Sequence, residues 1–155
     1  MKAILKFASQ VGAQLALNVD SVVNKAGRYF LLNEVLRKVT RQDFYYAGIY
    51  LGKVKNGKFF PSFNLLAMLA KGDANKVIID KQAAWLFICG RDIFRRSIIA
   101  VYGSRKKGAH TLVMNEFGEC LGFGKIQCPL DAAARDDEVV VKNVLDVGDF
   151  LRREV

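Results

Sequence analysis

Short apolar segments separated by glycine-containing turns fill residues 76–125, and this alternation constrains the fold more than any other feature of the sequence. The longest uninterrupted apolar run there, residues 83–89, is much shorter than the roughly 20 residues that a membrane-spanning helix needs. Short strands joined by tight turns are typical of a small β-barrel. The turns carry arginines and glycines but no plausible catalytic group, so the stretch indicates binding rather than catalysis.

The residues before this stretch predict alternating helices and strands. Apolar residues recur at helical spacing over residues 2–18 and predict a helix with one buried face. Asn33 is a good N-cap for a second helix over residues 34–40, in which Val35, Leu36 and Val39 are expected to pack inward.

A predicted β-hairpin and a third helix complete the first half of the chain. Residues 44–54 are rich in Tyr, Ile and Val and predict a strand whose aromatic residues belong to the core. The Asn56-Gly57 pair favours a tight turn into a returning strand. Ser62 then caps a helix that Gly72 ends.

A polar, turn-forming segment over residues 72–75 marks the expected boundary between two domains. Residues 1–74 are predicted to form an α/β domain, and residues 75–155 a strand-rich domain that contains a helix over residues 81–89. The strands expected in the second domain cover residues 77–79, 98–102, 109–114, 120–127 and 139–144.

Positive charge dominates the composition. The 24 Lys and Arg residues outnumber the 15 Asp and Glu residues, which gives a net charge of +9 and a pI near 9.6. Residues 1–74 hold eleven basic and four acidic residues, residues 76–125 nine and four, and residues 126–155 four and seven. Such an excess on a small protein favours a polyanionic partner.

Two groups of basic residues at glycine turns are the candidates for phosphate binding. Arginine presents a bidentate fork to a phosphate, and glycine lets backbone N–H groups approach it. The alternative is that exposed turns carry basic residues for solubility, and this alternative is stronger for Lys53, Lys55 and Lys58 around the first hairpin. The candidates are Arg91, Arg95 and Arg96 after Gly90, and Arg105, Lys106 and Lys107 at the tip of a later hairpin.

The sequence carries no recognisable catalytic or metal-binding pattern. His110 is the only histidine, so a single conventional general base is available. Cys89, Cys120 and Cys128 lack CxxC spacing and are expected to be buried, reduced thiols of an intracellular protein. Residues 121–124 lack the third glycine and the helix of a dinucleotide site. We therefore expect no cofactor, no metal and no enzymatic activity.

The order of the elements around Gly90, Gly103 and Gly118, followed by the strand motif at residues 121–124, resembles the PUA domain, a small RNA-binding pseudobarrel. The chain as a whole is similar to the Nip-seven family, in which a pre-PUA domain precedes a PUA domain, and its compact form resembles the archaeal members. The segments that carry this wider similarity are residues 28–32, 50–53 and 147–154.

This resemblance implies an α+β fold, with an N-terminal α/β pre-PUA domain at residues 1–74 and a C-terminal PUA mixed β-pseudobarrel at residues 75–155. It implies a non-enzymatic RNA-binding factor in ribosome biogenesis that acts in large-subunit assembly and in processing of precursor ribosomal RNA. The implied partners are single-stranded or irregular RNA and, through the N-terminal domain, ribosome-assembly or exosome-type proteins.

We expect a cytoplasmic monomer with no membrane attachment, or a nucleolar or nuclear protein if its source is eukaryotic. The alternative is an interaction protein of the same fold. Its basic surface would bind an acidic protein, or it would be an adaptor that targets an RNA-modifying or RNA-processing enzyme to transfer RNA or ribosomal RNA in trans.

The resemblance also implies which residues meet RNA. The turn Gly90-Arg91-Asp92 corresponds to the PUA segment that contacts RNA, with Arg95 and Arg96 beside it. Ser97 departs from the family pattern, since a glycine is common there, and the loop path next to it is expected to differ. The other implied or candidate contacts are Arg105, Lys106, Lys107, Lys125, Arg135, Lys142, Arg152 and Arg153.

Overall fold

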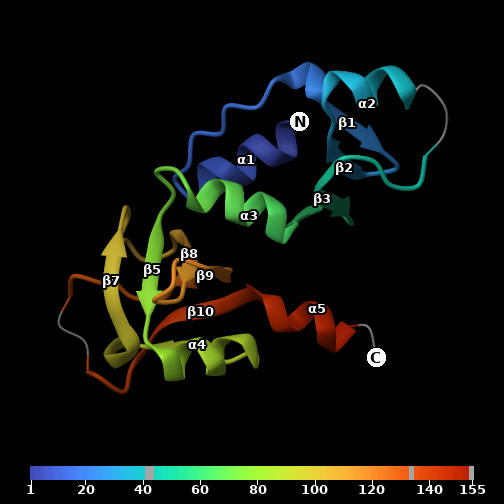
Figure 1. Cartoon of the computed structure of the whole chain (residues 1–155). Helices are drawn as coiled ribbons and strands as arrows, with labels where there is room; N and C mark the ends of the chain where they lie inside the picture. The colour runs from blue at the N-terminus through green and yellow to red at the C-terminus, as the bar shows by residue number, and fades with distance from the viewer. Residues whose placement is uncertain (41–43, 133–134, 154–155) are drawn as a thin grey trace.

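Two β-sheets and the helices packed on them form the part of the chain that the structure, a computed structural model, describes: residues 1–40, 44–132 and 135–153 (Figure 1). None of the helices in this part is long and apolar enough to cross a membrane. In chain order the elements are α1 (Lys2–Gln10), the 3₁₀ turn η1 (Val19–Ser21), β1 (Val22–Lys25), β2 (Arg28–Leu31), α2 (Glu34–Val39), β3 (Ile49–Lys55), β4 (Lys58–Pro61), α3 (Phe63–Ala70), β5 (Lys76–Ile79), α4 (Lys81–Ile88), β6 (Ile93–Phe94), the 3₁₀ turn η2 (Arg95–Ser97), β7 (Ile98–Tyr102), β8 (His110–Met114), β9 (Cys120–Ile126), β10 (Val139–Asp146) and α5 (Val147–Arg153).

The first sheet is an antiparallel meander in the order β1-β2-β3-β4. The predicted hairpin turn is confirmed, because Asn56 and Gly57 join β3 to β4 with φ angles of +51° and +73°, as a type I′ turn requires. Ala26 and Gly27, with φ angles of +50° and +80°, join β1 to β2 in a similar way. Strand β1 itself was not predicted.

The second sheet has the order β6-β10-β9-β8-β5-β7. Strands β5 and β8 are parallel, whereas the other neighbours are antiparallel, so the sheet is mixed. Helix α4 covers it, and buried Val77, Phe87, Ile93, Ile126 and Val140 form a core beneath the helix. The predicted α+β class is therefore confirmed.

Helices α1 and α3 lie between the two sheets and build one continuous core with both (Figure 1). Phe7 and Leu65 come from these helices, Leu51 comes from β3, and Leu112 and Phe123 come from β8 and β9. Because this core crosses residue 75, the two halves bury apolar surface against each other. The division into two domains stays a prediction.

The first helix is shorter than the predicted span of residues 2–18. Helix α1 ends at Gln10, and Gly12 takes a φ of +70° that directs the chain away from the helix axis. A Cβ at this glycine would lie 2.6 Å from Oδ1 of Asn75, so the turn is fixed by a contact with a distant residue. Helical spacing alone contains no information about this contact.

Two predictions of burial in the first half are wrong. Val35 and Val39 are 69% and 73% exposed, because the six-residue helix α2 packs inward only through Leu36. Tyr45 and Tyr46 are 80% and 56% exposed and precede β3 rather than belonging to it. The predicted strand over residues 44–54 thus begins only at residue 49. Residues 41–43, which precede the predicted strand, lie outside the part of the chain that the structure describes.

Candidate nucleic-acid interface

The turn at Gly90, Arg91 and Asp92 ends helix α4 and packs against β10. Gly90 has a φ of +91°, a conformation that favours glycine after a helix. Oδ1 of Asp92 accepts a hydrogen bond from the backbone N–H of Asn143 at 2.8 Å, so this carboxylate fixes the turn. The Arg91 side chain is exposed and free to meet a ligand.

Arg152 on α5 lies beside this turn, but its charge is already paired. Its guanidinium donates to both carboxylate oxygens of Asp146, at 2.9 and 3.1 Å, and to the carbonyl of Ile88 at 2.8 Å. Because Asp146 is buried, this ion pair ties α5 to α4 and β10. The neighbouring Arg153 belongs to α5, and its side chain lies outside what the structure describes.

Arg95 and Arg96 lie on the turn η2, next to an acidic loop. Their backbone N–H groups donate to the carbonyls of Glu138 at 2.9 Å and Asp136 at 3.1 Å. The Arg96 guanidinium lies 4.8 Å from the centre of the Phe94 ring. The arginines and the acidic residues therefore share one end of the molecule, where the net field is weaker than the arginines alone would give.

The same end carries further residues of mixed charge. Exposed Arg135 pairs with Asp137 at 3.7 Å, and Ser97 is buried, with its carbonyl accepting from the N–H of Asp80 at 3.1 Å. Ser97 thus belongs to the packing of η2 against the start of α4.

The hairpin tip at residues 105–107 is exposed and reaches toward η2. Partial burial raises the pKa of the Cys128 thiol, Glu138 raises it further, and the charges of Arg95 and Lys107 act in the opposite direction. Arg95 and Lys107 therefore lie close enough to influence the same thiol. Arg105 anchors the tip, because its carbonyl accepts from the N–H of Leu130 at 2.9 Å.

Lys125 and Lys142 are brought together with His110 in what we call the basic row. Lys125 lies directly opposite His110 on β8 and opposite Lys142 on β10, so the three side chains share one face of the sheet. Both lysines are exposed. Gly124 allows this close approach, since a Cβ there would lie 2.6 Å from the Lys142 carbonyl oxygen.

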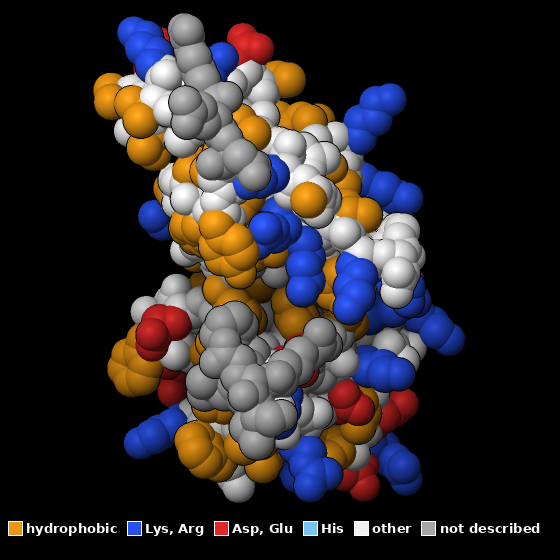
Figure 2. All heavy atoms as spheres, turned by 90° about the vertical axis from the view of Figure 1, so that its right-hand side faces the viewer, with side chains coloured by type: hydrophobic (Ala, Val, Ile, Leu, Met, Phe, Trp, Pro, Cys, Tyr) orange, Lys and Arg blue, Asp and Glu red, His pale blue; other side chains and the backbone are white. Residues whose placement is uncertain are grey.

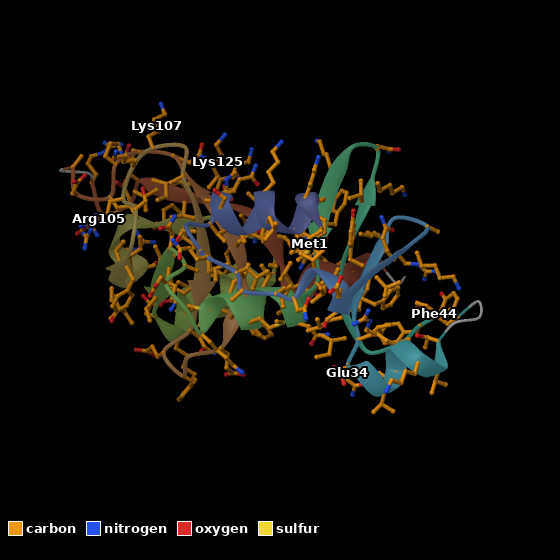
Figure 3. The ribbon with its side chains drawn as sticks, turned by 90° about the horizontal axis from the view of Figure 1, so that it is seen from above. Met1, Glu34, Phe44, Arg105, Lys107 and Lys125 are labelled. Atoms are coloured by element: carbon orange, nitrogen blue, oxygen red, sulfur yellow. The ribbon has the colours of Figure 1, made fainter. Side chains whose placement is uncertain are left out.

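The basic row belongs to a face that both halves of the chain share. Figure 2 shows Lys and Arg side chains gathered along one side of the molecule, over the upper and the lower part. Seen from above, Lys107 and Lys125 lie along the same edge, whereas Glu34 on α2 lies at the opposite one (Figure 3). The predicted contacts thus fall into three neighbourhoods: Gly90, Arg91 and Asp92 with Arg152; Arg95, Arg96, Arg105, Lys106 and Lys107 with Arg135; and Lys125 with Lys142.

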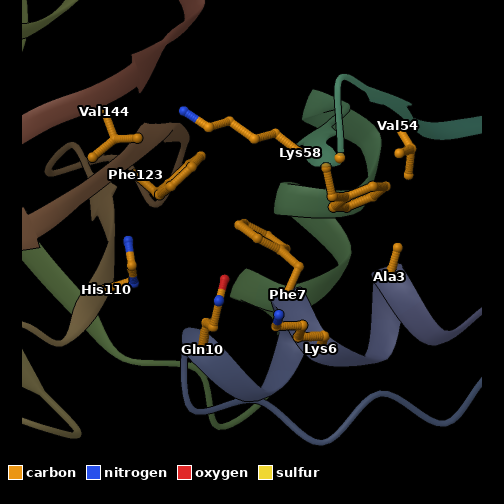
Figure 4. Close-up of a pocket in the computed structure, with 11 residues that line it drawn as sticks. Ala3, Lys6, Phe7, Gln10, Val54, Lys58, His110, Phe123 and Val144 are labelled. Carbon is orange, nitrogen blue, oxygen red and sulfur yellow. The ribbon is translucent and has the colours of Figure 1, made fainter.

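A groove of about 480 Å³ opens between the two halves beside the basic row (Figure 4). No sequence motif indicated it, because its lining comes from segments that are far apart in the chain. The one sequence feature that could have indicated a binding site here is the excess of lysines in the first half of the chain, which includes Lys58. The lining residues are Ala3, Lys6, Phe7 and Gln10 on α1, Val54, Gly57, Lys58 and Phe59 on the β3–β4 hairpin, and His110, Phe123 and Val144 on the second sheet.

Two titratable groups of the second sheet have shifted pKa values. Burial lowers the pKa of His110, and the nearby charge of Lys125 lowers it further, so the imidazole is neutral at pH 7. Burial raises the pKa of Cys120 to about 11, which keeps this thiol protonated. Cys89 is exposed, so the prediction that the three thiols are buried is wrong for this residue at the end of α4. The described residues contain no group of three His, Cys, Asp or Glu side chains that could hold a metal ion.

Comparison with known proteins matches the second half of the chain to a protein family. A family model described as the UPF0113 PUA domain matches residues 75–155. A UPF0113 protein from Archaeoglobus fulgidus is 27% identical over 162 residues, which cover 99% of this chain and 91% of that protein.

Two solved structures share the fold over almost the whole chain. One is a conserved PUA domain protein from Thermoplasma acidophilum, with a TM-score of 0.64 and 20% identity. The other is a hypothetical protein from Pyrococcus horikoshii OT3, with a TM-score of 0.63 and 17% identity. Each alignment covers 99% of this chain and 92% of the other. The predicted PUA fold, with an α/β portion before it, is confirmed.

Proposed function

Because the chain belongs to the UPF0113 PUA domain family, we propose that it is a non-enzymatic protein that binds RNA through the basic face shared by its two halves. The observation that carries this proposal is the basic row. Within the described part of the chain, no carboxylate pairs with Lys125 or Lys142. Exposed, unneutralised cations in register are suited to successive phosphates of a nucleic acid backbone.

We further propose that the RNA is ribosomal or pre-ribosomal and that the protein assists assembly of the large subunit in the cytoplasm. Support comes from the resemblance of the sequence at residues 28–32, 50–53 and 147–154 to the Nip-seven family, and from the similarity of the chain to a UPF0113 protein of an archaeon. In this proposal the N-terminal half contacts assembly or exosome-type proteins. Its exposed Val35, Val39 and Tyr45 provide apolar surface for such a contact.

Substitution of the three arginines that follow Gly90 tests whether the second half of the chain binds RNA. We expect the combined variant Arg91→Ala, Arg95→Ala and Arg96→Ala to bind single-stranded RNA about tenfold more weakly, since three phosphate-directed charges are lost. The fold should persist, because Arg95 and Arg96 make their described hydrogen bonds through backbone groups. Electrophoretic mobility shifts at matched salt measure the affinity.

The matched control removes three exposed charges elsewhere, at Arg37, Lys38 and Lys71. Its affinity should stay within about twofold of wild type, apart from a small loss of long-range attraction. Mobility shifts that do not differ between the two triple variants would contradict a role for the arginine turn.

A crosslinking-and-sequencing map of RNA bound in cells tests the proposed biological role. Crosslinks at ribosomal or precursor ribosomal RNA are the expected result. Crosslinks confined to transfer RNA would instead assign the protein as an adaptor for an enzyme that acts there, and the absence of RNA crosslinks would overturn the proposal.

A further inference from the structure

The groove between the two halves has an aromatic floor. Phe59, Phe7 and Phe123 follow one another with ring centres 5.8 and 5.1 Å apart, and the His110 ring lies 6.0 Å from Phe123. The rings come from the β3–β4 hairpin, from α1 and from the second sheet, so they form a continuous row across the boundary between the halves (Figure 4). Phe7 and Phe123 are only 4% and 7% exposed and belong to the core, so the accessible ring surface of the row comes mainly from the partly exposed Phe59 and His110 at its two ends. A planar ligand can pack against such accessible rings.

The rim of the groove is positively charged. Lys6 on α1 and Lys58 on the hairpin line it directly, and the Lys125 of the basic row lies opposite His110. Among the described residues that line the groove, none is Asp or Glu. Within the same part of the chain, no carboxylate pairs with Lys6, Lys58 or Lys125. An anionic occupant is therefore favoured.

Rigid elements hold these groups in place before any ligand arrives. Lys6 lies on a helix, and Lys58 directly follows the type I′ turn at Asn56 and Gly57. His110 is fixed at the start of β8, because its carbonyl accepts a hydrogen bond from Nδ2 of Asn75 at 3.0 Å. A preorganised site loses little conformational entropy when it binds.

The size of the groove limits what it can hold. A volume of about 480 Å³ lies within the range of about 300–1,000 Å³ that is usual for small-ligand sites, whereas a duplex cannot enter such a space. The combination of aromatic floor and cationic rim matches the two parts of a nucleotide, a planar base and a phosphate. A polyanion without bases would use the rim and leave the floor empty.

We propose that this groove binds a single nucleotide within single-stranded RNA, with its base over the aromatic row, whose accessible ends are Phe59 and His110, and its flanking phosphates at Lys6, Lys58 and Lys125. The proposal rests on the RNA-binding function proposed above. It adds that the N-terminal half, through α1 and the hairpin, contributes RNA contacts of its own.

The single histidine makes the groove directly observable. His110 is the only histidine in the chain, so its imidazole signals in NMR spectra report on this site without assignment of other residues. Addition of a short single-stranded RNA of mixed sequence should shift these signals. An abasic oligonucleotide, which has the same length and the same number of phosphates as this RNA but no bases, should bind about tenfold more weakly, because the base contacts are missing.

A pair of charge-reversal variants completes the test. Lys6→Glu with Lys58→Glu should weaken binding of the mixed-sequence RNA at least about tenfold and abolish the His110 shift. Arg37→Glu with Lys38→Glu changes the charge by the same amount on α2, at the opposite edge of the molecule (Figure 3), and should retain the shift. Circular dichroism checks that both variants, altered only at exposed positions, keep the fold.

The possible failures are distinguishable. If wild-type protein binds the RNA while the His110 signals stay in place and the two variants bind alike, the groove assignment is wrong and the proposed function stands. If the abasic oligomer binds as tightly as RNA, or an oligoglutamate shifts His110 equally, the groove is only a general anion site. If wild-type protein binds no RNA, both proposals fail.

Discussion

Asn75 joins the two halves of the chain through its backbone and its side chain. Its N–H donates to the Val11 carbonyl at 2.7 Å, Nδ2 donates to the His110 carbonyl, and Oδ1 accepts from the Ser104 N–H at 2.9 Å. Asn75 is only 7% exposed, so water cannot readily replace these partners. A residue in a segment that the sequence marks as a polar linker is in fact a buried connection.

At this scale we predict that Asn75→Ala lowers the free energy of unfolding by about 2 kcal/mol, because two partly buried backbone groups, the His110 carbonyl and the Ser104 N–H, lose their hydrogen-bond partner. Urea denaturation followed by circular dichroism measures the change. Ser104→Ala leaves the Ser104 N–H in place and should cost less than about 1 kcal/mol. Equal stability of Asn75→Ala and wild type would show that the halves do not depend on this connection.

Among the elements, helix α5 depends on one buried carboxylate. Asp146 ends β10, and its Oδ1 accepts from the N–H of Asp149 at 2.8 Å in the first turn of α5. The same carboxylate pairs with Arg152 one helical turn later. Asp146 thus both caps the helix and attaches it to the sheet.

We predict that Arg152→Ala lowers the free energy of unfolding by about 2 kcal/mol, because buried Asp146 loses its cation. This loss is smaller than that expected for a fully buried ion pair, since the Arg152 side chain is partly exposed to solvent. Thermal unfolding measures the effect, and Arg91→Ala, which removes an exposed neighbouring arginine, should change stability by less than about 0.5 kcal/mol. If Arg152→Ala weakens RNA binding but leaves stability unchanged, this arginine contacts RNA rather than holding α5.

The elements that could be predicted are those whose ends are encoded locally. Asp80 caps α4 by accepting from the Ala83 N–H at 2.8 Å, and Asn56 with Gly57 forms the expected turn. The end of α1 was not predicted because the turn at Gly12 is fixed by a close contact with Asn75, a residue far away in the sequence. Helix α5 was missed because its cap is supplied by the last residue of a strand.

For the candidate site, the sequence identified the basic residues but not their grouping. Lys125 and Lys142 become neighbours only through the register of β9 and β10, which the glycines on β9 permit. The groove combines Lys6, Lys58 and His110, whose separation in the chain leaves no local pattern. Whether each predicted residue contacts RNA stays a prediction.

The whole molecule combines a shared core with a shared basic face. The core between α1, α3 and both sheets holds the halves together, and cations from both halves lie along one side of the molecule (Figure 2). The charge surplus of residues 1–74 therefore adds to that of the PUA domain. An RNA strand that follows this face would contact both.

The salt dependence of RNA binding tests this account most directly. Fluorescence anisotropy of a labelled single-stranded RNA, titrated with wild-type protein over a salt series, gives the slope of log affinity against log salt. With about four phosphates neutralised, affinity should fall about fiftyfold between about 50 and 200 mM salt. Absence of binding at about 50 mM salt, or an affinity that does not change over this range, would contradict the account.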